Sequence, residues 1–269
     1  YGKMIAGCAA ALKTQTGKIG YVGPLIDPET IRLTNSVYLG ARHCYETYRG
    51  MDPDMLDFAV TWIGFWFNIP GFTLDPTEVS NAFIDNGRDV LISGIDTTEA
   101  IVVAGQRAAE GMAVWAIPYD FEGACEEAPE ICLGVPYFNW GPSYLETIKA
   151  VQDGTWKAAW DWNGPDWTDI NNPDTSHVGY LYGDGLTDEE KATLDEFIAG
   201  LAAGALGEEG GLHLWVGPLS FQDGSVFLAE GEVATSKQVW FQAANAEEAT
   251  APEEVTPPQL LAGVQGASK

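Results

Sequence analysis

Short apolar runs alternate with longer helical patterns in the first half of the chain. Four runs are typical of β-strands: residues 18–23, 58–65, 89–94 and 113–118. Three intervening segments carry apolar residues at three- and four-residue spacing, which predicts helices: residues 28–48, 76–86 and 98–110. Alternating strands and helices are the pattern of βαβ units, so an α/β fold around a parallel sheet is predicted.

Capping residues support the predicted helix starts. Asp27-Pro28 and Asp75-Pro76 each combine an N-cap side chain with proline at the first helical position. Thr97-Thr98 offers a similar cap to the third helix. Thr187 with Glu190 forms a capping box before a further helix that reaches about residue 203.

The pattern is looser after residue 119. A strand is predicted near residues 131–136, and a helix over residues 140–152 with Asn139 as its cap. Residues 214–219 and 225–228 flank Asp223-Gly224, which predicts a β-hairpin. From residue 243 to 269 the chain is acidic and contains proline, which predicts a mobile tail as far as Leu260-Leu261.

The charge is strongly negative, with 39 acidic against 13 basic residues and a formal net charge of -26. Such a field repels phosphate backbones, so nucleic acid is not expected as a partner. An acidic surface suits concentrated salt, but ordinary solubility explains it equally well. The first residues lack the features of a signal peptide, so any export signal or lipid anchor is expected upstream.

The four cysteines suggest an oxidising compartment. Cys125 and Cys132 bracket a short loop containing proline that a disulfide can close. Cys8 and Cys44 lie in two apolar, helix-like segments, where they can pair or remain buried thiols.

Catalytic motifs are not evident. The sequence has no Walker loop, no dinucleotide-binding glycine motif and no nucleophile elbow, and its three histidines lack partners at metal-ligand spacing. We therefore expect a protein that is not an enzyme and holds neither cofactor nor metal.

Three strand ends carry side chains suited to binding. Asp96 and Asp120 follow predicted strands, and Trp66 ends a third, so all three are expected at the carboxyl edge of one sheet, where open parallel sheets bind ligands. A carboxylate accepts hydroxyl or amine hydrogen bonds and an indole offers a flat apolar face, which suits a ribose or a base. The alternative is that the aspartates cap helices and the aromatic residues are core.

Several segments together resemble the basic membrane protein family of substrate-binding lipoproteins, also called the purine nucleoside receptor family. The early segments are Ala6-Gly7 and residues 14–22, 28–35 and 39–42. Later segments follow in the same order: residues 83–91, 119–120, 139–144, 153–157, 217–218 and 222–224.

The resemblance implies a type I periplasmic-binding-protein fold, in which two Rossmann-like lobes with parallel sheets close on a ligand. Residues 1–135 then form the second lobe, and residues 136–242 the remainder of the first lobe, with its crossovers and hairpin. Family members carry more first-lobe structure before the opening helix, so the N-terminal part of that lobe is expected to be absent here.

The resemblance also implies roles for individual residues. Asp120 matches an aspartate that contacts the ligand's sugar or polar edge. Asp96 matches the strand-end aspartate of a His-Thr-Asp-Ser segment, and Trp66 matches an aromatic residue that lines the cleft. Asn139 and Trp140 match a crossover near the hinge. Gly64-Phe65 replaces the family's Asn-Ser and residues 68–74 resemble an insertion, so the specificity can differ.

The function implied is that of an extracytoplasmic, membrane-anchored receptor that delivers a purine nucleoside or nucleobase to the permease of an ABC importer. A monomer is expected. Two alternatives stay open: the same fold binding a sugar or another small heterocycle, and a sensory module unconnected with transport.

Overall fold

A five-stranded parallel sheet forms the centre of the molecule. The computed structural model describes residues 1–249 and 254–268. Its sheet has the order β4-β3-β1-β2-β9, with every neighbouring pair parallel. The strands are β1 (Lys18–Gly23), β2 (Asp57–Trp62), β3 (Val90–Ser93), β4 (Trp115–Ile117) and β9 (Val264–Gln265). The parallel sheet predicted from the alternating pattern is confirmed.

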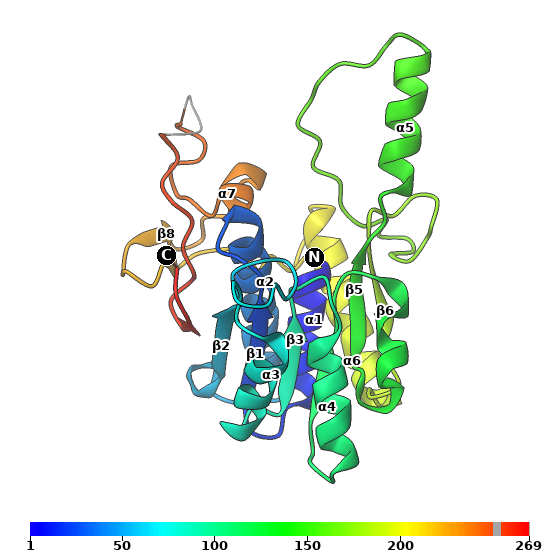
Figure 1. The fold of residues 1–269 in the computed structure, drawn as a ribbon. Helices are drawn as coiled ribbons and strands as arrows, with labels where there is room; N and C mark the ends of the chain where they lie inside the picture. Colours follow the sequence, from blue (N-terminus) through cyan, green and yellow to red (C-terminus); the bar gives the residue numbers. More distant parts are fainter. Residues whose placement is uncertain (250–253, 269) are drawn as a thin grey trace.

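Two pairs of helices cover the two faces of this sheet (Figure 1). Helices α1 (Gly2–Lys13) and α2 (Pro28–Thr47) pack on one face, and α3 (Pro76–Asp85) and α4 (Glu99–Ala109) on the other. Side chains alternate between the faces with the two-residue period of a strand. Ile19 and Tyr21 lie in the core beneath α1 and α2, whereas Val22 lies in the core beneath α3 and α4.

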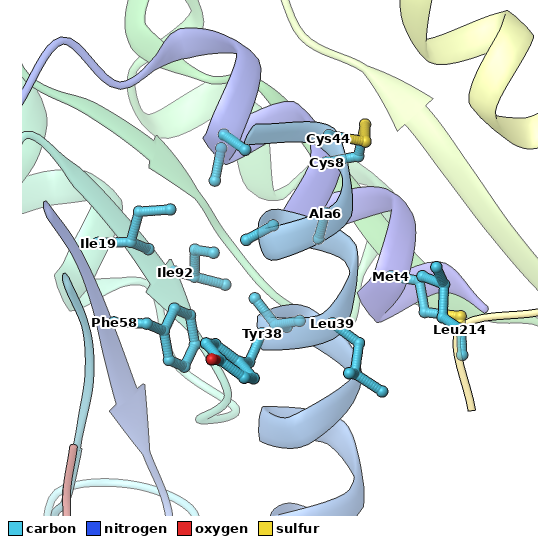
Figure 2. Close-up of a cluster of buried hydrophobic side chains, with 14 of the residues drawn as sticks. Met4, Ala6, Cys8, Ile19, Tyr38, Leu39, Cys44, Phe58, Ile92 and Leu214 are labelled. Carbon is cyan, nitrogen blue, oxygen red and sulfur yellow. A yellow bond between two sulfur atoms is a disulfide. The ribbon is translucent and has the colours of Figure 1, made fainter. Parts of the chain in front are cut away.

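Helices α1 and α2 cross at very short range. A Cβ atom on Gly7 would lie 2.0 Å from the carbonyl oxygen of Val37, and one on Gly40 would lie 2.0 Å from that of Met4. Only glycine permits this approach. A disulfide between Cys8 and Cys44 joins the two helices, and Figure 2 shows it beside the buried side chains of the core.

The predicted capping residues are largely confirmed. Asp27 accepts a hydrogen bond from Thr30 N, Asp75 accepts one from Thr77 N, and Thr187 forms its capping box with Glu190. Thr98 occupies the N-cap position of α4, as predicted, but its side chain makes no capping hydrogen bond. Strand β2 ends at Trp62, earlier than predicted, because Gly64 has a φ of +104° that an extended strand cannot contain.

A second region follows β4. The 3₁₀ turns η2 (Glu122–Glu127) and η3 (Pro129–Ile131) form a loop closed by the disulfide between Cys125 and Cys132. Strands β5 (Gly134–Phe138) and β6 (Val178–Tyr182) then pair in an antiparallel sheet of their own. Within the described residues the central sheet is the one parallel sheet.

Two helices of this region differ in their packing. Helix α6 (Asp188–Ala205) buries Leu194, Phe197 and Leu201 in the core with α1 and α2. Helix α5 (Gly141–Gln152) projects away from the body of the protein (Figure 1) and buries only Pro142. The prediction of Asn139 as the cap is wrong, because the helix begins at Gly141 and its N-cap residue is Trp140. The Asn139 side chain lies one residue earlier and accepts from the Gly141 amide.

The predicted hairpin forms, but it is shorter than expected. Strands β7 (Leu219–Ser220) and β8 (Val226–Leu228) pair antiparallel, with Gly224 at a φ of +83° in the turn. The expected strand over residues 214–219 is interrupted by Pro218, which has no amide hydrogen to donate to a ladder. Helix α7 (Ser236–Phe241) follows.

The chain packs against the core at the end of the expected tail. Residues 250–253 and 269 lie outside the described residues. After them Leu260, Leu261 and Val264 are buried, and β9 pairs with β2 at the edge of the central sheet. These apolar residues lie where the mobile tail was predicted to end, and they enter the core. None of the helices within residues 1–249 and 254–268 has the length and apolar character needed to cross a membrane.

Candidate functional site

A small cavity lies at the carboxyl edge of the central sheet. Its volume is about 240 Å³, and its lining residues come from the segments after four of the sheet's strands and after β5: Glu29, Trp66, Asp96, Tyr119, Asp120, Phe138 and Trp140. Four of the five residues predicted to bind ligand are in this set. The structure thus brings together side chains up to 111 positions apart in the chain, between Glu29 and Trp140.

Asp120 has the most unusual conformation in the cavity. Its φ is +92°, a value that residues other than glycine rarely adopt and that is concentrated at functional sites. Its Oδ1 atom is buried and finds no hydrogen-bond partner among the described residues. Burial raises the pKa of Asp120, an effect that Lys3 opposes and Asp96 reinforces. The carboxylate is therefore held in place with acceptor capacity unused.

Lys3 supplies a buried positive charge beside Asp120. Its ammonium group donates to Ser93 O at 2.8 Å, at the end of β3, and lies 3.7 Å above the centre of the Tyr119 ring. Burial lowers the pKa of Lys3 to about 7, and the charge of Asp120 partly opposes this change. The pair partly compensates the cost of burying each charge alone.

Asp96 and Trp66 are positioned by the same backbone contact. The amide of Asp96 donates to Trp66 O at 2.8 Å, which fixes the loop after β2 against the loop after β3. Asp96 is exposed and Trp66 is half-buried. Partial desolvation by the surrounding protein also raises the pKa of Asp96. This carboxylate therefore remains accessible to a ligand that enters the cavity.

The opposite wall comes from the segment after β5. The backbone at Asp120 bridges to that at Tyr137, which brings Phe138 and Trp140 over the carboxyl edge of the central sheet. The Trp140 side chain is 57% exposed and stacks near Tyr144, with ring centres 6.2 Å apart. A flat apolar surface thus faces the carboxylates.

Asn139 differs from the other four predicted residues. Its side-chain amide donates to Pro173 O and Ser176 O, both at 2.8 Å, and its oxygen accepts from Gly141 N. It lines a larger neighbouring cavity of about 590 Å³ instead of the small one. These contacts fix the crossing of the chain from β5 to α5.

The sequence prediction missed two charged residues of the site. Glu29 lies in the first turn of α2 and lines both cavities, and burial raises its pKa. Arg32, one turn later, lines the larger cavity. Both sit on a helix whose start was predicted, and the rule that ligands bind beyond strand ends also applies to the segment after β1. No group of three or more His, Cys, Asp or Glu residues in the described ranges is arranged to hold a metal.

Comparison with known proteins gives two relatives by sequence. The chain is 30% identical over 233 residues to a purine-binding protein of Brucella abortus, a match that covers 87% of this chain and 57% of the relative. It is 31% identical over 162 residues to a putative ABC transporter glucose-binding protein of Haloferax volcanii, covering 60% of this chain and 37% of that protein. The chain thus spans little more than half the length of the first relative and less of the second. No protein-family model matches the sequence.

Solved structures share the fold. An ABC transporter solute-binding protein of Aeropyrum pernix K1 superposes with a TM-score of 0.58 at 14% identity, over 82% of this chain and 63% of that one. A transcriptional activator of the comK gene from Bacillus halodurans superposes with a TM-score of 0.52 at 15% identity, over 76% and 62%. The fold is that of the periplasmic binding proteins, and by its sequence the chain is related to the solute-binding proteins of ABC transporters.

Proposed function

We propose that the chain is part of an extracytoplasmic solute-binding protein of an ABC importer, of the purine nucleoside receptor type, and that its small cavity binds a purine nucleoside or nucleobase. The observation that carries the proposal is the convergence of Trp66, Asp96, Asp120 and Trp140 on one cavity. Positions at strand ends predicted that Trp66, Asp96 and Asp120 share one edge of the sheet, and the resemblance placed Trp140 near the hinge. The first relative is named as purine-binding.

The side chains suit such a ligand chemically. Asp96 and Asp120 accept hydrogen bonds from ring N–H, amino or ribose hydroxyl groups. Trp66 and Trp140 offer faces on which a base can stack, a contact worth about 1–3 kcal/mol per base. The site selects for donors, because three carboxylates line a cavity of about 240 Å³.

The arrangement of lobes suggests how binding is signalled. We assign residues 1–135 to one lobe and residues 136–242 to part of the other, with β5 and the segment after it forming the opposite wall. A ligand that contacts both walls favours the closed state by its differential affinity. The closed protein, as a monomer tethered by a lipid anchor, then engages the permease, and the two disulfides fit an oxidising compartment.

A sugar is the second candidate ligand. The second relative is named as a putative glucose-binding protein. Paired sugar hydroxyls are also good donors to carboxylates, and an indole face packs well against the apolar face of a pyranose. The residues of the cavity accommodate either ligand, so the choice needs a direct test.

A thermal-shift screen tests the proposal. Nucleosides, nucleobases and sugars are each added to the chain, because a ligand that binds only the folded form raises the Tm by mass action. We expect adenosine, guanosine, inosine or their bases to raise the Tm. A shift with glucose alone would transfer the proposal to sugars, and no shift with any compound would contradict it.

A further inference from the structure

Arg32 is a buried arginine with one buried donor atom that has no partner among the described residues. Its side chain lies in α2 and is 9% exposed overall, yet Nη1 has no hydrogen-bond partner among the described residues. Nη2 lies 4.0 Å from Glu29 Oε1, which is too far for a hydrogen bond. Buried donors without partners are rare in folded proteins and call for an explanation.

Arg88 provides the comparison within the same chain. It is also 9% exposed, but its Nη1 donates to Asp57 Oδ1 at 2.9 Å and to Asp57 O at 3.1 Å. Burial therefore does not explain why Arg88 is hydrogen-bonded and Nη1 of Arg32 is not. Arg88 has a hydrogen-bonded partner, whereas Arg32 has only a long ion pair with Glu29 and two aromatic rings. Its guanidinium carbon lies 4.4 Å from the ring centre of Trp240 and 5.3 Å from that of Trp162.

The two tryptophans contact the guanidinium but accept no hydrogen bond from its N–H groups. Their rings are 5.6 Å apart and nearly perpendicular, so Arg32 sits in the angle between them. Cation–π contacts stabilise the charge but accept none of the in-plane N–H bonds. Trp162 is 43% exposed and belongs to residues 155–166, which form neither helix nor strand.

Arg32 lies next to the proposed purine cavity. It lines the cavity of about 590 Å³, which shares Glu29, Tyr119, Phe138 and Trp140 with the small cavity. The two cavities therefore adjoin: Asp96 and Asp120 line the small cavity, Arg32 lines the larger one, and Glu29 lines both. A ligand that spans them meets acceptors at Asp96 and Asp120 and donors at Arg32.

The charges around Arg32 indicate which kind of ligand group it can bind. An anionic group is disfavoured by the neighbouring carboxylates and by the net charge of -26. A neutral edge with two adjacent acceptors matches the planar fork of arginine, and in nucleic-acid recognition the commonest such edge is O6 and N7 of guanine. Adenine presents a donor at the corresponding 6-position, which an arginine does not accept.

We propose that Arg32 is a specificity-determining residue that recognises the O6/N7 edge of a 6-oxopurine while the carboxylates bind the donors of the same ligand. This inference rests on the proposed function. It adds Arg32 to the site and narrows the ligand from purines in general to 6-oxopurines.

Calorimetric titrations with hypoxanthine, adenine and 7-deazahypoxanthine test the inference on the full chain. Hypoxanthine is expected to bind at least about tenfold more tightly than either of the others, because each good bidentate contact is worth about 1–3 kcal/mol of discrimination. In Arg32→Gln this preference should fall below about threefold. Arg88→Gln, equally buried, should keep the preference, even if it lowers the Tm.

The outcomes separate the two proposals. Binding of purines with no preference for hypoxanthine, or an unchanged preference in Arg32→Gln, would overturn the role of Arg32 and leave the purine site intact. If the unmodified chain binds no purine, both the purine site and the role of Arg32 are contradicted. If Arg32→Gln does not fold, Arg32→Lys retains the charge without the planar fork and should show the same loss of preference. The preference of the unmodified chain for hypoxanthine over adenine and 7-deazahypoxanthine tests the inference without any variant.

Discussion

The region of the central sheet and the region around α5 are stabilised in different ways. In the first, helices pack on both faces of a parallel sheet, and buried charges such as Arg88 and Asp89 have hydrogen-bonded partners. In the second, α5 exposes Tyr144, Leu145, Ile148 and Val151 and buries only Pro142. Apolar spacing therefore predicts a helix in both regions but does not predict what packs against it.

The largest expected effect comes from the disulfide that joins α1 to α2. Its cysteines are 36 residues apart, so replacing both Cys8 and Cys44 by alanine should lower the free energy of unfolding by about 4 kcal/mol, mainly by freeing the unfolded chain. The cysteines of the second disulfide are 7 residues apart, so Cys125→Ala with Cys132→Ala should cost only about 2.5 kcal/mol. Guanidinium titration measures both, and equal losses would argue against this account.

Leucines on the two helices of the second region provide the next test. Leu194 of α6 is fully buried in the core, whereas Leu145 of α5 is 69% exposed. Leu194→Ala should destabilise the chain by about 2–5 kcal/mol, and Leu145→Ala by less than about 0.5 kcal/mol. Chemical unfolding distinguishes them. A large cost at Leu145 would show that α5 is covered in solution.

Lys3 predicts a smaller, pH-dependent effect. Because burial lowers its pKa to about 7, the folded chain binds fewer protons than the unfolded chain between that value and the ordinary lysine pKa of 10.5. Its contribution to stability therefore rises with pH in this window, by up to about 1.4 kcal/mol per pH unit. Lys3→Met should remove this rise, and Lys157→Met, at an exposed site, should retain it. Melting curves between about pH 7 and pH 9 would show the difference, and identical pH profiles would contradict the role of Lys3.

The sequence predicted the fold well wherever local rules determine it. Asp27, Asp75 and Thr187 cap their helices because a side-chain oxygen three or two residues away satisfies an end amide. Strand β9 was not predicted, because a two-residue strand has no periodicity and forms only through its partner β2.

The grouping of the candidate residues around one cavity was predicted in part. Asp96, Asp120 and Trp66 follow strands, so the topology of a parallel sheet is sufficient to bring them to one edge. Arg32 was missed because its surroundings come from Trp162 and Trp240, far along the chain, and no local pattern relates them. The conformation of Asp120 was not predictable either, since a positive φ at an aspartate has no sequence signature.

The central claim is that the carboxylate of Asp120 binds the ligand. The most direct test is a calorimetric titration of the unmodified chain, Asp120→Ala and the exposed control Asp184→Ala with the compound that gives the largest thermal shift. We predict that Asp120→Ala weakens binding by at least about tenfold, the loss of a charge-assisted hydrogen bond of about 1.5–3 kcal/mol, while Asp184→Ala binds normally. Unchanged affinity in Asp120→Ala would remove Asp120 from the site and contradict the account.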